Sequence, residues 1–245
     1  MVFILPKVIA HRGAPLVAPE NTLASLRAAK SLGATWVEFD VQLTHDGKAI
    51  IFHDDELDRT TNGKGLVAAL SYDLISELDA GSWFNKKFKN ERIPTLTDYL
   101  QCAAQLGLGI NVELKGTASQ SEALARCVAT ALQSYWPKHL PVPLISSALP
   151  ACLQSMKAIT DEYPQGFIMH EWADSWRDTV DELGCVSLHV EYEQLNPKRA
   201  EAVKLAEKKL LAYTINDATV AKSLFDIGVD SVFSDNPELL EQTFY

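Results

Sequence analysis

Short runs of alternating or continuous apolar residues are separated by longer segments in which apolar residues recur every three or four positions. The short runs have the pattern of strands, and the longer segments have the period of amphipathic helices. Nine strands are expected, at residues 8–10, 36–44, 49–53, 109–115, 143–147, 166–170, 186–190, 210–214 and 231–234. Helices are expected at residues 23–33, 71–79, 96–106, 122–135, 150–160, 175–183, 197–208, 218–227 and after Asn236. This succession of strand and helix predicts an α/β fold.

The strand at 49–53 is the exception to this succession. A crossover between parallel strands needs a dozen or so residues, and the link from Thr44 to Lys48 is much shorter. Asp46-Gly47 is typical of a tight turn, so this strand should return antiparallel to the one before it. Eight parallel strands then alternate with helices, which favours a (β/α)8 barrel with a β-hairpin after its second strand over an open doubly wound sheet. No G-x-G-x-x-G follows a strand, so a dinucleotide site is not expected.

Residues 55–92 lack a regular period and form an insertion of about 40 residues in what is otherwise one domain, residues 1–245. Turn-forming residues at 60–65 and a short helix at 71–79 are its main features. Long irregular insertions in compact domains are often lids or substrate-binding loops, and a surface excursion without function is the alternative.

Charge and cysteine content narrow the class of protein. The 245 residues carry a net charge of −10, which argues against a nucleic-acid partner but leaves room for a small phosphate ligand in a locally cationic pocket. The four cysteines have no metal-binding spacing and are expected to be free thiols. The apolar run Met1–Leu5 is too short for a signal peptide and no run is long enough to span a bilayer, so we expect a cytoplasmic protein without an integral membrane segment.

Two carboxylates and a histidine should meet at the hairpin. Glu38 and Asp40 are two residues apart and project from one face of their strand, and the return strand would place His53 close to Asp40. Carboxylates suit a hard divalent cation, and histidine titrates near neutral pH. A solvated sheet face is the alternative reading of these alternating polar residues.

Two more strands end in residues of the same kind. His11-Arg12 follows the first strand, and Glu113 and Lys115 end the strand at 109–115, although a structural ion pair would also explain the last two. In a barrel, the carboxyl ends of all strands meet at one face, where active sites lie. Three carboxylates could hold one Mg²⁺ or Ca²⁺, two cations could bind a phosphoryl group, and two histidines could serve as acid and base. This combination suits displacement at a phosphodiester, where a nucleophile loses a proton and a leaving alkoxide gains one.

Together these segments resemble the motif set of the glycerophosphodiester phosphodiesterases, and the match covers nearly the whole chain. The motifs are His11-Arg12-Gly13, Pro19-Glu20-Asn21-Thr22, Glu38-x-Asp40, Thr44-x-Asp46-Gly47, His53-Asp54, Glu113-x-Lys115 and a closing Ser-Asp-Asn-Pro around Asp235.

The resemblance implies a distorted triosephosphate-isomerase-type barrel that hydrolyses glycerophosphodiesters, such as glycerophosphocholine and glycerophosphoethanolamine, to sn-glycerol 3-phosphate and an alcohol. In related enzymes a glycerol hydroxyl is thought to attack phosphorus, giving a cyclic phosphate that water opens. The implied roles are metal ligands Glu38, Asp40 and Glu113, acid–base residues His11 and His53, and phosphate ligands Arg12 and Lys115.

Some positions depart from the family pattern or remain open. Tyr213 stands where the family often has Trp, and Ala148 stands where it often has an aromatic residue. His170 and His189 end strands and could line the pocket. Four aromatic residues could form an apolar wall for the alcohol group or could simply pack in the core or on the surface: Trp83, Phe84, Trp172 and Trp176. A non-catalytic phosphate-ester binding barrel and a lysophospholipid phosphodiesterase are the alternative functions.

Overall fold

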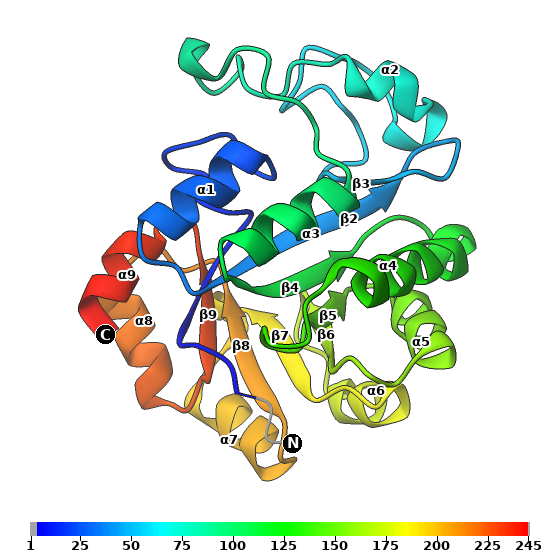
Figure 1. The fold of residues 1–245 in the computed structure, drawn as a ribbon. Helices are drawn as coiled ribbons and strands as arrows, with labels where there is room; N and C mark the ends of the chain where they lie inside the picture. The colour runs from blue at the N-terminus through cyan, green and yellow to red at the C-terminus, as the bar shows by residue number, and fades with distance from the viewer. Residues whose placement is uncertain (1–3, 245) are drawn as a thin grey trace.

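The computed structural model describes residues 4–244. Residues 1–3 and Tyr245 lie outside this range, so the expectation about a signal peptide at Met1–Leu5 falls partly on undescribed residues, as do the two ends of the expected domain. Eight parallel strands close into a barrel in the order β1-β2-β4-β5-β6-β7-β8-β9, with β9 pairing back to β1 (Figure 1). The barrel, and not the open sheet, is therefore the fold. The strands are β1 (Val8–Ala10), β2 (Trp36–Leu43), β4 (Gly109–Leu114), β5 (Leu144–Ser147), β6 (Gln165–Met169), β7 (Ser187–Glu191), β8 (Lys209–Tyr213) and β9 (Ser231–Ser234).

The ninth strand, β3 (Ala49–Ile51), is antiparallel to β2, as predicted. Gly47 adopts φ +80° in the turn, where its N–H donates to the carbonyl of Thr44 at 3.0 Å. Because β1 is short, it pairs with β2 at a single register position, Ala10 with Val37. The upper part of β2 is thereby left available to the hairpin, and the Phe52 N–H donates to the Asp40 carbonyl at 3.0 Å.

Helices surround the barrel and cover its outer face, as Figure 1 shows. Their sequences carry apolar residues on one side, and these pack against the outward-facing residues of the strands. Among residues 4–244, no helix is long and apolar enough to cross a membrane. The helices are α1 (Leu23–Ser31), α3 (Leu96–Gln105), α4 (Ser121–Tyr135), α5 (Pro150–Ile159), α6 (Trp176–Leu183), α7 (Pro197–Leu205), α8 (Ala218–Asp226) and α9 (Pro237–Phe244).

Both faces of β2 are buried. Val37, Phe39 and Val41 pack against the helices, whereas Glu38 and Asp40 point into the barrel, where they are 3% and 1% exposed. The alternation of apolar and polar residues therefore marks the outside and the inside of the barrel, and the reading as a solvated sheet face is wrong. The bottom of the barrel is closed by an apolar layer: Ile9, Trp36, Leu144, Leu211 and Phe233.

The insertion between β3 and α3 lies beyond the hairpin, at one side of the barrel in Figure 1. It has a small hydrophobic cluster of its own, built on Ile50 of β3 and on residues such as Leu57 and Ile75. The helix expected at 71–79 is shorter, α2 (Tyr72–Ser76), and the chain turns directly after it, where the Leu78 N–H donates to the Ile75 carbonyl at 3.1 Å. The remaining helical segments are single 3-10 turns at Val67–Ala69, Lys86–Phe88, Ala118–Gln120 and Tyr192–Gln194.

Asp79 organises the end of this insertion. Its carboxylate accepts hydrogen bonds from the backbone N–H groups of Gly81, Ser82 and Asn90 at 2.8–2.9 Å, and from the Ser82 hydroxyl at 2.7 Å. Partial burial would raise the pKa of Asp79, but these hydrogen bonds outweigh it and lower the pKa well below 3.8.

Replacing Asp79 by alanine should destabilise the insertion by about 1–2 kcal/mol, since the loop N–H groups lose a common acceptor. Because folding lowers the pKa of Asp79, this contribution is present above pH 3.8 and is lost as the pH falls below it. Amide exchange of Gly81 and Asn90 at neutral and acidic pH measures the effect. Glu77→Ala is the control, since the ion pair of Glu77 with Arg92, at 3.8 Å, is exposed and should contribute little to stability.

Candidate active site

The seven residues expected at the site come from β1, β2, β4 and the hairpin return: Glu38 and Asp40 lie within β2, and the other five lie at or just beyond the carboxyl ends of their strands. Six of them line a cavity of ≈ 120 Å³ at this end of the barrel, and the seventh, Asp40, is buried beside it. His53 follows β3 and reaches the cavity because the hairpin turns it back toward Asp40. The residues are His11, Arg12, Glu38, Asp40, His53, Glu113 and Lys115.

Three carboxylates gather at the centre. One oxygen each from Glu38, Asp40 and Glu113 lies within 4.8 Å of the other two. Register explains the meeting, because Asp40 pairs directly with Glu113 across β2 and β4. Burial and the neighbouring carboxylates raise the pKa of Glu38 well above its ordinary value and that of Glu113 to about 7. Two buried carboxylates and a half-buried one in this arrangement repel one another unless a cation lies between them.

Two cationic side chains partly offset this repulsion. The Lys115 ammonium lies 3.4 Å from Glu113 and 3.9 Å from Asp40, and the Arg12 Nε lies 3.4 Å from Asp40. Burial would raise the pKa of Asp40, but Arg12, His53 and Lys115 outweigh burial and lower it. Asp40 is therefore a carboxylate at neutral pH, as a metal ligand must be.

The carboxylate cluster fits a hard divalent cation. The Oε1 atom of Glu38 is buried and has no hydrogen-bond partner within residues 4–244, although the other carboxylate oxygen, Oε2, accepts the Arg12 N–H at 3.0 Å. Buried carboxylate oxygens are seldom left unpaired, because desolvation without a partner is costly. An all-oxygen donor set of this kind is what Mg²⁺ and Ca²⁺ bind.

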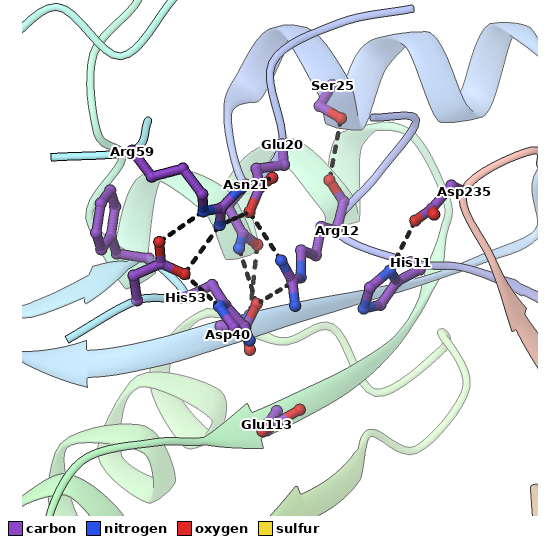
Figure 2. Close-up of polar contacts among 12 residues, drawn as sticks. His11, Arg12, Glu20, Asn21, Ser25, Asp40, His53, Arg59, Glu113 and Asp235 are labelled. Carbon is purple, nitrogen blue, oxygen red and sulfur yellow. Dashed lines mark hydrogen bonds and ion pairs between the residues drawn. The ribbon is translucent and has the colours of Figure 1, made fainter. Parts of the chain in front are cut away.

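The loop after β1 presents Arg12 to the site. Arg12 has φ +51°, and Gly13 follows at φ +89°, where a Cβ atom would collide with Ser25 of α1. The Ser25 hydroxyl closes the loop, donating to the Arg12 carbonyl at 3.0 Å and accepting the Ala14 N–H at 2.7 Å. Figure 2 shows the Arg12 side chain directed between Glu20 and Asp40. The His-Arg-Gly segment thus forms a tight turn of the backbone, and this turn directs the Arg12 guanidinium toward Glu20 and Asp40.

His11 is oriented by a carboxylate from the last strand's end. Its Nδ1 lies 2.8 Å from Asp235 (Figure 2). Asp235 in turn accepts a hydrogen bond from the Asn216 amide at 2.9 Å. The other ring nitrogen, Nε2, faces the cluster at 4.0 Å from Glu38. A carboxylate on Nδ1 fixes the tautomer and leaves Nε2 to exchange protons.

His53, like His11, is held by a carboxylate through Nδ1. Its Nδ1 lies 2.6 Å from Asp54, which leaves Nε2 to exchange protons. Burial and the cations Arg12 and Lys115 lower the pKa of His53, and Asp40 and Asp54 only partly oppose this shift. Two histidines, each held by a carboxylate, therefore enter one cavity.

Arg59 of the insertion links the two carboxylates that position His53 and Arg12. It makes two hydrogen bonds to Asp54, at 2.6 and 2.9 Å, and two to Glu20, both at 2.8 Å. Glu20 also accepts from Arg12 at 2.9 Å, so one guanidinium links the supports of His53 and Arg12 (Figure 2). Bidentate pairs of this kind fix geometry as well as charge.

Arg59→Ala should lower kcat by roughly 10- to 100-fold with the fold retained, because Asp54 and Glu20 would be free to rotate away from His53 and Arg12. Arg59→Lys should recover little of the lost kcat, since lysine cannot form two forked pairs. Steady-state kinetics with a circular-dichroism check of folding measures this effect.

Arg92→Ala is the control. Arg92 also lies in the insertion, but it donates hydrogen bonds to the carbonyls of Glu77 and Leu78, so its replacement should change kcat less than threefold. An equal loss of kcat in Arg92→Ala and Arg59→Ala would show that Arg59 has no specific role in positioning Asp54 and Glu20.

The far wall of the cavity comes from β6, β7 and β8. His170 and His189 line it, as the strand ends suggested, and so does Tyr213, whose hydroxyl lies 2.9 Å from His170 Nδ1. The four aromatic residues considered for an apolar wall do not line this cavity. Trp176 is buried against the helices beside Trp172, and Trp83 and Phe84 pack on each other in the insertion. Their packing role is therefore the one observed.

Sequence reasoning did not assign Arg59, Asp235 or Asn111 to the site. Asn111 could have been found, since it lies two residues before Glu113 on the same face of β4. Asp235 was visible as part of the closing motif but without a partner. Nothing in the irregular sequence around Arg59 indicates where its side chain points.

The cavity holds two histidines, a carboxylate cluster and two cationic side chains, and these groups are suited to the hydrolysis of a phosphodiester. Residues 11–239 match the model of the glycerophosphoryl diester phosphodiesterase family. A glycerophosphodiester phosphodiesterase of Caldanaerobacter subterraneus is 32% identical over 234 residues, covering 95% of each chain. The chain belongs to this family and to its class of enzyme.

Solved structures agree with this assignment. A phosphodiesterase of Oleispira antarctica, determined in complex with the product sn-glycerol 3-phosphate, is 39% identical with a TM-score of 0.94, and the match covers 97% of this chain and 96% of that one. A glycerophosphodiester phosphodiesterase of Agrobacterium tumefaciens is 29% identical with a TM-score of 0.82, covering 97% of this chain and all of that one.

Proposed function

We propose that this enzyme hydrolyses glycerophosphodiesters, such as glycerophosphocholine and glycerophosphoethanolamine, to sn-glycerol 3-phosphate and the head-group alcohol. The observation that carries this proposal is the pair of carboxylate-held histidines, His11 and His53, on two sides of one cluster of acids and cations. Binding of a phosphate ester alone does not need two such histidines. Cleavage of a phosphodiester does, because a nucleophile loses a proton and a leaving oxygen gains one.

In the proposed reaction, the cationic residues bind the phosphate and the histidines transfer protons. The Arg12 guanidinium and the Lys115 ammonium hold the phosphoryl oxygens. The glycerol hydroxyl next to the ester attacks phosphorus and gives its proton to Nε2 of one histidine. The bond from phosphorus to the head-group oxygen breaks, and that oxygen takes a proton from the other histidine. Water then opens the cyclic phosphate by the same transfers in reverse.

Glu38, Asp40 and Glu113 would hold one Mg²⁺ or Ca²⁺, which offsets the charge of the phosphoryl oxygens when bound. The buried Oε1 atom of Glu38, which has no hydrogen-bond partner within residues 4–244, supports this assignment.

We place the activity in the cytoplasm, in keeping with four free thiols and no membrane-spanning helix within residues 4–244.

The decisive assay measures sn-glycerol 3-phosphate released from glycerophosphocholine and glycerophosphoethanolamine, with chelator and with added Mg²⁺ or Ca²⁺. Release should stop with chelator and return with metal. Tight binding without turnover under any metal would instead indicate a non-catalytic binding barrel. A lysophospholipid cleaved faster than both diesters would indicate the lipid phosphodiesterase alternative.

A further inference from the structure

The floor of the cavity differs in chemistry from its rim. The rim carries the charged groups, whereas the floor carries uncharged polar side chains that the proposed mechanism does not use. Asn111 of β4 and Ser146 of β5 are 1% and 0% exposed, yet both line the cavity. Nothing in phosphate binding or proton transfer explains why amide and hydroxyl groups are buried here.

The hydrogen bonding of these two residues is incomplete. The Asn111 amide nitrogen donates to the Ser146 hydroxyl oxygen at 2.9 Å. The Asn111 amide oxygen is buried and has no partner within residues 4–244. Because the Ser146 oxygen accepts from Asn111, its own hydrogen can donate elsewhere. The floor thus offers one acceptor and one donor side by side.

The chemistry of this pair selects the group that could complete it. An alcohol hydroxyl donates and accepts at once, so it can pair with both Asn111 and Ser146. An ammonium can donate to Asn111 but cannot accept from Ser146, and a quaternary ammonium can do neither, so neither charged head group would satisfy both residues, and each would also lose its hydration. The nearby His189 is 1% exposed, and burial lowers its pKa to about 3, so it adds no charge to the floor.

The position of the floor suits the glycerol side of the substrate. Asn111 pairs with Glu38 and lies two residues below Glu113 on the same face of β4, roughly 6–7 Å deeper in the barrel. This depth is comparable to the reach of an extended glycerol ester from its phosphorus atom to its terminal hydroxyl oxygen. Gly166 of β6 makes room for the ring of His189 at this level of the barrel, because a Cβ atom there would collide with that ring.

We propose that Asn111 and Ser146 form a subsite for the terminal hydroxyl of the glycerol moiety, the one that takes no part in the reaction. The subsite makes this enzyme specific for phosphodiesters of glycerol, while the head-group alcohol remains on the rim side. The inference rests on the proposed function in so far as the bound ester is a glycerophosphodiester.

The test compares two phosphodiesters with the same leaving alcohol, one of glycerol and one of propane-1,2-diol, which keeps the reacting hydroxyl and lacks the terminal one. The native enzyme should prefer the glycerol ester in kcat/KM by on the order of 100-fold, since the analogue leaves buried polar groups unpaired. Asn111→Leu should reduce the preference to less than about tenfold. Ser146→Ala, a smaller change that guards against misfolding, should reduce it in the same direction.

Gln165→Leu is the matched control, because Gln165 is also a buried amide with an unpaired oxygen but does not line the cavity. It should keep the native preference. Calorimetric binding of sn-glycerol 3-phosphate against propane-1,2-diol 1-phosphate gives a readout that does not depend on turnover, and it should show the same contrast between the variants.

Equal use of both esters by the native enzyme would overturn the proposal. So would an unchanged preference in Asn111→Leu and Ser146→Ala, or a loss of metal affinity in Asn111→Leu with the preference intact, which would make Asn111 a metal ligand. Failure of the native enzyme to cleave either ester would refute the proposed function, and calorimetry would still decide the subsite.

Discussion

Replacing His53 by alanine is expected to lower kcat by roughly 10²- to 10⁴-fold, and replacing His11 should do the same. Each ring has Nδ1 bound by a carboxylate, Asp54 or Asp235, and only Nε2 can exchange protons with the reacting oxygens. Since one histidine must take a proton while the other gives one, either loss interrupts a transfer. The double variant should be little worse than either single variant, because residues that act as a unit are not additive.

The fold should survive these substitutions, because both rings lie at the open end of the barrel and not in its apolar layers. His45→Ala, in the exposed hairpin turn, is the control and should keep native activity. Turnover on glycerophosphocholine and the midpoint of thermal unfolding together separate chemistry from stability. Near-native turnover in His53→Ala or in His11→Ala would show that the acid–base assignment is wrong.

The barrel was predictable because its elements repeat with regular periods. The alternation from Trp36 to Leu43 marks inside and outside, and the turn at Gly47 makes the following strand an antiparallel companion. The convergence of Glu38 and Glu113 follows from the same logic, since parallel strands end at one face. Local pattern and overall topology therefore agree at the residues expected to hold the metal.

The supports around those residues could not be predicted in the same way. Arg59 lies in an irregular segment, and its four hydrogen bonds to Asp54 and Glu20 depend on how that segment folds back. Asp235 meets His11 from 224 residues away. Contacts of this kind depend on tertiary packing and do not follow the residue periodicity from which helices and strands are predicted. Asn111 was not predicted either: its place on the inner face of β4 follows from the alternation of the strand, but its hydrogen bond to Ser146 depends on the neighbouring strand.

The carboxylate cluster has a second consequence, for stability. Glu38→Gln should lower turnover roughly 10³-fold, since the neutral amide is a poor ligand for a hard cation and phosphoryl charge loses its counter-charge. Without metal, however, the free energy of unfolding of the variant should be about 1–2 kcal/mol higher than that of the native protein. This difference corresponds to a midpoint of thermal unfolding that is higher by roughly 2–8 °C. Burial and the neighbouring carboxylates raise the pKa of Glu38, so its charged form is unfavourable in the folded protein.

The pH dependence of the metal-free protein follows with a defined sign. An acid whose pKa is raised by folding binds protons more tightly when folded, so stability declines as the pH rises above its ordinary value of 4.5. The decline should be smaller in Glu38→Gln. Saturating Mg²⁺ or Ca²⁺, at about 100 times its Kd, should stabilise the native protein by about 2.7 kcal/mol and leave the variant nearly unchanged.

Glu241→Gln distinguishes this effect from the removal of any buried acid. Glu241 of α9 is buried, and burial raises its pKa, but it lies outside the cavity. Its replacement should leave turnover and the response to metal as in the native protein. A metal-free Glu38→Gln that is less stable than the native protein would show that the three carboxylates do not repel one another as their geometry requires. A higher midpoint with turnover lost would show that the enzyme gives up stability to keep a cation site.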